Sequence, residues 1–145
     1  MYIKNLPLFI GGASSLIASV LHIAIIFGGP DWYRFFGAGE NMAQMAARGE
    51  IKPTIITLFI ASVLAIWAAY GFSGAGLIPH FHFMRFCLVG ISAVYLIRGF
   101  MPFLIMPLFP HITDTFWIIS SAICAFIGVC YAVGAWQMWQ SLAKT

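Results

Sequence analysis

Four long runs of apolar residues, separated by shorter polar stretches, dominate the chain. The runs span about residues 7–27, 53–77, 83–102 and 114–142. Each is close to the roughly 20 apolar residues that a helix needs to cross a bilayer. The pattern therefore predicts an all-α fold, an integral membrane four-helix bundle formed by a single transmembrane domain over residues 1–145.

Glycine and proline mark the ends of these runs. The first run ends where Gly28, Gly29 and Pro30 interrupt it. The third helix is expected to become irregular at Pro102, because proline lacks a backbone donor and clashes with the preceding turn. Three prolines occur in residues 102–110, so this segment is interpreted either as a kinked extension of the helix or as a short re-entrant piece.

The polar stretch between the first two runs has a pattern of its own. Within residues 38–48, Glu40, Gln44 and Arg48 are four apart and share one side of a helix, whereas methionine and alanine occupy the other. Such spacing predicts a short amphipathic helix that lies on the membrane or caps the bundle.

Composition agrees with this pattern and excludes some partners. The chain is 62% hydrophobic and 8% charged, with a mean hydropathy of +0.97, whereas soluble domains carry roughly 25% charged residues. A net charge of +3 from seven lysines and arginines is too sparse for the clustered basic face of a nucleic-acid-binding protein. No nucleic-acid partner is predicted.

Polar side chains are expected to gather at one membrane face. Since successive helices alternate in direction, the ends of the first and third helices meet the beginnings of the second and fourth there. We expect a ligand-binding pocket closed by the connection between the first two helices. Its candidate residues are His22, Asp31, Arg34, Glu40, Thr57, Tyr95, Arg98, Asp114, Trp117 and Ser121.

Arg98 is the strongest single indication of such a pocket. An ionised group near the bilayer centre costs about 2.5 kcal/mol or more and normally faces a partner or water. Glu40 or Asp114 is the expected partner. The alternatives are a purely structural ion pair, a side chain that extends to the interface, and a contact with a ligand or lipid headgroup.

His22 and the acidic residues allow two further interpretations. His22 is either a core histidine bonded to a serine or carbonyl, or part of a proton path. His111 and Asp114 are three residues apart and could bind a metal together with His22. Because no HExxH motif is present and the cysteines lie elsewhere, no metal and no other cofactor is predicted.

Charge gives only weak guidance on orientation. One side of the predicted bundle holds Lys4, Arg85 and Lys144 without any acid, while the other carries both signs. Counting lysine and arginine alone gives a tie under the positive-inside rule. The acid-free side is interpreted as cytoplasmic, which places both termini in the cytoplasm.

Three short strings carry a resemblance to known proteins. RFFGAGE, YGFSGAG and YLIRGF resemble elements of small, uncharacterised four-helix inner-membrane proteins of Gram-negative bacteria. This resemblance implies a multi-pass location in the bacterial inner (cytoplasmic) membrane. A looser similarity, through a histidine in the first helix and an aromatic last helix, links the chain to EXPERA-type ligand-binding and isomerase proteins. No acidic residue lies in 53–77, so no catalytic residue is transferred.

These features support three functional hypotheses. The leading one is a non-enzymatic membrane protein whose pocket binds a membrane lipid, a small amphipathic ligand or a membrane partner and supports envelope integrity. The second is a small membrane enzyme in which His22 and a carboxylate move a proton on a lipid-soluble substrate. The third is a homo-oligomeric ion or drug carrier, since small-residue stripes suit helix association.

Overall fold

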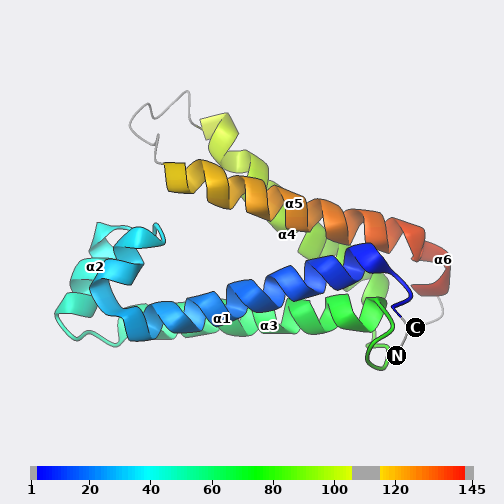
Figure 1. The fold of residues 1–145 in the computed structure, drawn as a ribbon, viewed down its shortest axis with the longest axis horizontal. Coiled ribbons are helices and arrows are strands. Elements are labelled where there is room, and N and C mark those ends of the chain that lie inside the picture. The colour runs from blue at the N-terminus through cyan, green and yellow to red at the C-terminus, as the bar shows by residue number, and fades with distance from the viewer. Residues whose placement is uncertain (1–2, 106–114, 143–145) are drawn as a thin grey trace. The chain divides into compact units, whose positions relative to one another are not determined.

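The computed structural model describes residues 3–105 and 115–142, and every regular element within them is a helix (Figure 1). Four of these helices are long and apolar enough to cross a membrane. The chain is therefore an all-α, multi-pass membrane protein with a short helix between its first two membrane helices. The elements are α1 (Leu6–Phe35), α2 (Glu40–Ala47), α3 (Lys52–Gly74), α4 (Met84–Ile105), α5 (Thr115–Gln137) and α6 (Trp139–Leu142).

The chain divides into two compact units that share α1 and α3. The first, here called the four-helix unit, comprises Met1–Ser15 and Trp67–Thr145. The second, the hairpin unit, comprises Leu16–Ile66. The grouping of residues 1–145 into one domain stays a prediction.

The four-helix unit packs through small residues in α1 and α3. A Cβ atom added at Gly71 would lie 2.7 Å from the Cα of Gly12, so the two backbones touch. Close approach of this kind supplies the van der Waals contact that holds helices together in lipid, where no hydrophobic force drives them together. Larger side chains fill the space beside this contact, and Leu8, Leu88 and Tyr131 are fully buried.

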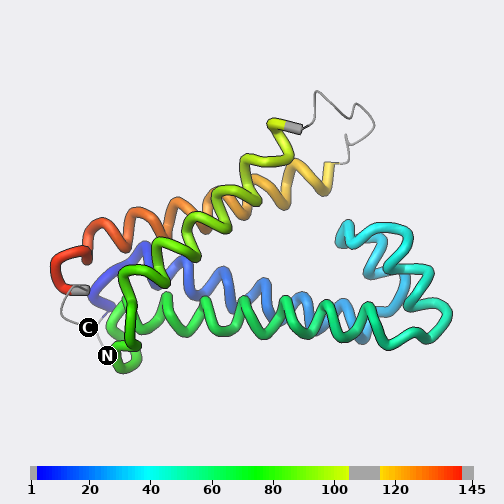
Figure 2. The backbone as a smooth tube through the Cα atoms, turned by 180° about the vertical axis from the view of Figure 1, so that it is seen from behind, coloured from blue at the N-terminus to red at the C-terminus, as the bar shows by residue number. Residues whose placement is uncertain are grey.

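In the same unit α4 and α5 pack side by side and antiparallel (Figure 2). The Ser92 hydroxyl donates to the Gly128 carbonyl at 2.9 Å. Further along, a Cβ at Gly99 would lie 2.6 Å from the backbone nitrogen of Ala125. Residues later in α4 thus contact residues earlier in α5, so the end of α4 lies beside the beginning of α5.

The connection from α3 to α4 is fixed by one buried serine. Ser73 donates its hydroxyl to the Pro79 carbonyl at 2.8 Å and accepts the Phe81 amide at 3.2 Å. The amide of Lys4 donates to the Ala75 carbonyl at 2.9 Å. The chain before α1 is therefore bound to the same end of the four-helix unit as this connection.

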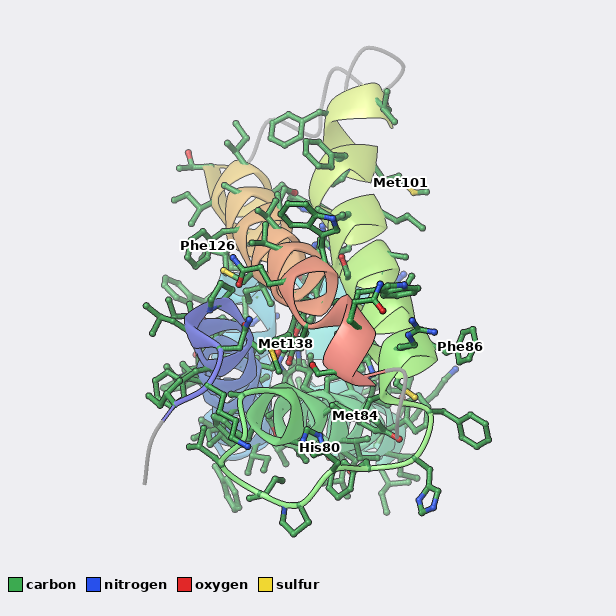
Figure 3. All side chains as sticks on the ribbon, turned by 90° about the vertical axis from the view of Figure 1, so that its right-hand side faces the viewer. His80, Met84, Phe86, Met101, Phe126 and Met138 are labelled. Carbon is green, nitrogen blue, oxygen red and sulfur yellow. The ribbon has the colours of Figure 1, made fainter. Side chains whose placement is uncertain are left out.

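Apolar side chains cover the outside of the four-helix unit. Figure 3 shows Phe86 and Met101 projecting away from α4 and Phe126 projecting away from α5. These side chains are 74%, 51% and 57% exposed, respectively. A belt of exposed apolar residues is expected where lipid tails replace water around membrane helices.

The hairpin unit contains a sharp break in α1. Gly29 has φ 70° and ψ −156°, outside the helical region, and helical residues lie on both sides of it. Pro30 follows directly, and its fixed φ and missing N–H suit the first turn of a new helix. The chain therefore changes direction at Gly29 and continues as helix to Phe35.

A small hydrophobic core holds α2 against the last turns of α1. Ile25, Tyr33 and Ala43 are buried together, and Phe36, Met42 and Ala46 pack around them. The apolar side of the predicted amphipathic segment is thus covered by protein.

The observed helices can be compared with the expected boundaries. The first helix was expected to end near residue 27, and Gly29 does interrupt it at that point. A second helical segment, which was not expected, begins at Pro30 and continues to Phe35. α3 ends at Gly74 instead of residue 77; Gly76, with φ 81°, lies in the connection that follows.

α4 extends beyond the expected boundary at residue 102. It contains Pro102 and continues as helix to Ile105, as in the alternative of an extension past the proline, because the proline removes only its own backbone donor. The fourth run, expected as one helix over 114–142, is α5 followed by the short α6. The question of a re-entrant piece falls mainly on residues 106–114, outside the described residues.

Candidate functional site

A chain of hydroxyl groups crosses the interior of the four-helix unit. The Ser15 hydroxyl lies 2.9 Å from the Tyr95 hydroxyl and 3.2 Å from the Tyr131 hydroxyl. Tyr131 donates to the carbonyl of Trp67 at 2.8 Å. The rings of Tyr95 and Tyr131 stack at a centroid distance of 6.0 Å, and the Trp67 ring meets Tyr95 edge-on at 5.1 Å.

Counting donors fixes the direction of each bond. A carbonyl only accepts, so the single hydroxyl proton of Tyr131 goes to Trp67. Ser15 must then donate to Tyr131, and Tyr95 must donate to Ser15. Tyr95, a predicted pocket residue, is therefore committed to an internal network and is 5% exposed. Sequence reasoning missed Tyr131 because its partners lie on three other helices.

Arg98 lies at the other end of the α4–α5 contact from α6. Its guanidinium carbon is 5.0 Å from the centre of the Trp117 ring, and Nη1 lies 3.5 Å from the buried Ser121 hydroxyl. Arg98 itself is exposed. The structure thus brings together three of the predicted pocket residues, Arg98, Trp117 and Ser121.

The described residues give Arg98 no acidic partner. Glu40, one expected partner, instead pairs with Arg34, and none of the ion pairs among the described residues includes Arg98. Asp114, the other expected partner, lies outside the described residues. What Arg98 does contact is an aromatic face and a hydroxyl, which are weaker partners for a cation than a carboxylate.

Asp31, Arg34 and Glu40 form a surface network in the hairpin unit. Arg34 donates two hydrogen bonds to Glu40, of 2.9 and 3.0 Å, and one to Asp31 at 3.0 Å. The Asp31 side chain is 92% exposed and that of Glu40 56%. Hydrogen bonding by Arg34 lowers the pKa of Glu40 below its ordinary value. These three residues bind the end of α1 to the beginning of α2.

The remaining candidates in the hairpin unit make local contacts. Nδ1 of the half-buried His22 lies 2.8 Å from the Ala18 carbonyl, one turn earlier in the same helix. The buried Thr57 donates to the Tyr33 hydroxyl at 3.3 Å. Within the described part of the chain, no carboxylate hydrogen-bonds with His22, and no three histidine, cysteine or acidic side chains gather as metal ligands. His111 lies outside that part.

The predicted pocket residues therefore fall into separate groups. Arg98 with Trp117 and Ser121 combines a charge and an exposed surface with predicted site residues from two different membrane helices. Comparisons of the chain with known protein families, with curated proteins and with solved structures found no match.

Proposed function

We propose that the chain is a non-catalytic protein of the bacterial inner membrane that holds the headgroup of a lipid, or of a small amphipathic ligand, at Arg98. Trp117 and Ser121 form the rest of this headgroup site. In this proposal lipid binding near one membrane face supports the integrity of the envelope.

The depth of Arg98 in the membrane favours a headgroup partner. Arg98 precedes the end of α4 at Ile105 by seven residues, which is about 10 Å along the axis at 1.5 Å per residue. An arginine side chain can span most of that distance to reach the interface. Its guanidinium then meets the zone where lipid phosphates lie.

The chemistry of the three residues also favours a phosphate. The planar guanidinium presents several N–H groups in a fork that matches phosphate oxygens. Trp117 covers one side of it at 5.0 Å, which keeps the fork oriented without using its donors. The Ser121 hydroxyl is 3.5 Å from Nη1, a long contact that leaves room for a stronger acceptor.

Charge supports a cytoplasmic position for the termini. Asp31 lies in the last turns of α1, and the other three acidic residues fall between α1 and α3 or between α4 and α5. Lys4, Arg85 and Lys144 lie on the opposite side of the proposed crossings. Lysine and arginine are equally numerous on the two sides, so the proposed orientation rests on the absence of acidic residues from the side of Lys4, Arg85 and Lys144, which we place in the cytoplasm. The Arg98 site then belongs to the outer leaflet of the inner membrane.

Native mass spectrometry of the protein in mild detergent, titrated with phosphatidylethanolamine, tests the headgroup site. Arg98→Ala is expected to weaken retention of the lipid about tenfold, since charge-assisted bonds contribute about 1.5–3 kcal/mol, and Arg98→Lys should lose less. Arg48→Ala is the matched control, because Arg48 is exposed and bonds to Glu50 at 2.7 Å. This control should bind as the wild type does.

The Asp114→Asn variant distinguishes a lipid headgroup from Asp114 as the partner of Arg98. If Asp114 balances Arg98, this variant should lower the melting temperature as much as Arg98→Ala does, and lipid retention should be equal in all variants. That outcome would contradict the headgroup site. In cells, a deletion strain sensitive to envelope stress should be rescued by the wild type and not by Arg98→Ala.

A further inference from the structure

A second aromatic site lies at the opposite end of the four-helix unit. Trp136, Gln137, Trp139 and Gln140 line an open pocket of about 390 Å³ where α5 passes into α6. The guanidinium of Arg85, in the first turn of α4, lies 4.2 Å from the centre of the Trp139 ring and donates from Nε to the Trp139 carbonyl at 3.2 Å. Trp139 thus lines the pocket and also carries the guanidinium of Arg85 on its ring.

Several N–H groups at this pocket have no hydrogen-bond acceptor among the described residues. Nε of Arg85 hydrogen-bonds to the Trp139 carbonyl, and among the described residues neither terminal nitrogen has an acceptor. The Gln137 carbonyl oxygen accepts from Asn5 at 2.9 Å, which leaves its NH₂ group as a donor. Arginine and amide donors without an acceptor favour an anion.

The charge of the residues around the pocket, and their expected level in the membrane, also favour an anion. In the described segments at this end of the unit, residues 3–5, 75–85 and 137–142, the charged residues are Lys4 and Arg85, and none is acidic. Trp136 is 78% exposed, as expected of a tryptophan at the level of lipid headgroups. The described residues at this end therefore attract an anion from the membrane surface and include no acidic side chain that would repel it.

We propose that this pocket, together with the Arg85 guanidinium that stacks on the Trp139 ring, binds the headgroup of an anionic phospholipid. The phosphate accepts from the free nitrogens of Arg85 and from the amides of Gln137 and Gln140, while the acyl chains lie along exposed Trp136 and the apolar side of the helices. The site is separate from Arg98, at the other end of α4, and does not depend on it.

Native mass spectrometry with two competing lipids tests this inference. The wild type in mild detergent is titrated with equal amounts of phosphatidylglycerol and phosphatidylcholine, and a preference for phosphatidylglycerol is expected. Arg85→Ala should reduce that preference about tenfold, and Arg85→Lys, which keeps the charge but loses the fork, should reduce it less. Arg98→Ala should keep the preference, which distinguishes this site from the one proposed above.

A second measurement locates the lipid directly. A photoreactive benzophenone side chain at position 141, which is exposed and follows the pocket residue Gln140, should crosslink to phosphatidylglycerol in vesicles. The same group at Phe126, which is 57% exposed on α5, should show no preference for that lipid. Crosslinking at position 141 that is equal for both lipids, or an unchanged lipid preference in a folded Arg85→Ala or Arg85→Lys variant, would overturn the inference.

Discussion

At the scale of single residues, the arginines of this protein have different contact partners. Arg34 is neutralised by two carboxylates, whereas Arg85 and Arg98 each rest on a tryptophan ring, at opposite ends of α4. A guanidinium on an aromatic face keeps its edge donors available. The two arginines that have no acidic partner among the described residues are therefore the ones at which we place the proposed lipid sites.

The tyrosines of the hydroxyl chain should contribute unequally to stability. Tyr131→Phe removes the donor to Trp67 and the acceptor for Ser15, so we expect a loss of about 1–2 kcal/mol. Tyr95→Phe removes a single bond to Ser15 and should cost less. Thermal unfolding in detergent, followed by circular dichroism, measures both. A larger loss for Tyr95→Phe would contradict the assigned bond directions.

At the scale of helices, small residues decide how closely the elements approach. Gly12 of α1 and Gly71 of α3 allow backbone contact, and Gly99 does the same for α4 against Ala125 of α5. Gly29 acts differently, because its positive φ changes the direction of α1. These four glycines thus serve either packing or turning, and sequence alone does not distinguish the two.

Alanine substitutions test this distinction. Gly71→Ala should destabilise the protein by about 1–3 kcal/mol through overpacking, because the new Cβ would lie 2.7 Å from Gly12. Gly90 is the matched control on α4, since nothing lies within 4 Å of a Cβ added there. Gly90→Ala should be neutral or slightly stabilising, as alanine favours helix over glycine. Equal melting temperatures for the two variants would refute close packing of α1 on α3.

At the scale of the whole molecule, four crossings fix how the connections are distributed. With α1, α3, α4 and α5 each spanning the membrane, α2 and the α3–α4 connection belong to opposite sides. The proposed orientation places the connection in the cytoplasm and α2 outside. Exposed residues are present in both, Gln44 in α2 and His82 in the connection.

Cysteine labelling in spheroplasts checks the orientation. In a background without Cys87, Cys124 and Cys130, Gln44→Cys should react with a membrane-impermeant maleimide, and His82→Cys should react only after lysis. The reverse pattern would place the termini outside. Labelling of both from outside would contradict four crossings.

The candidate site was only partly predictable. Arg98, Trp117 and Ser121 were expected at one level of the membrane, and they do lie together. Arg34 and Glu40 were expected to close over a pocket but pair with each other on the surface. They lie six residues apart on either side of a turn, and a local ion pair of that kind forms without any distant partner.

The sequence by itself determined the class of fold and the membrane helices. In lipid every backbone polar group must be satisfied within its own segment, so an apolar run of sufficient length has little alternative to a helix. The identity of side-chain partners was decided only by the tertiary structure. The contacts of Tyr131 with Ser15 and of Arg85 with Trp139 depend on how each helix is rotated about its axis and on which helices are neighbours. An apolar run fixes neither of these.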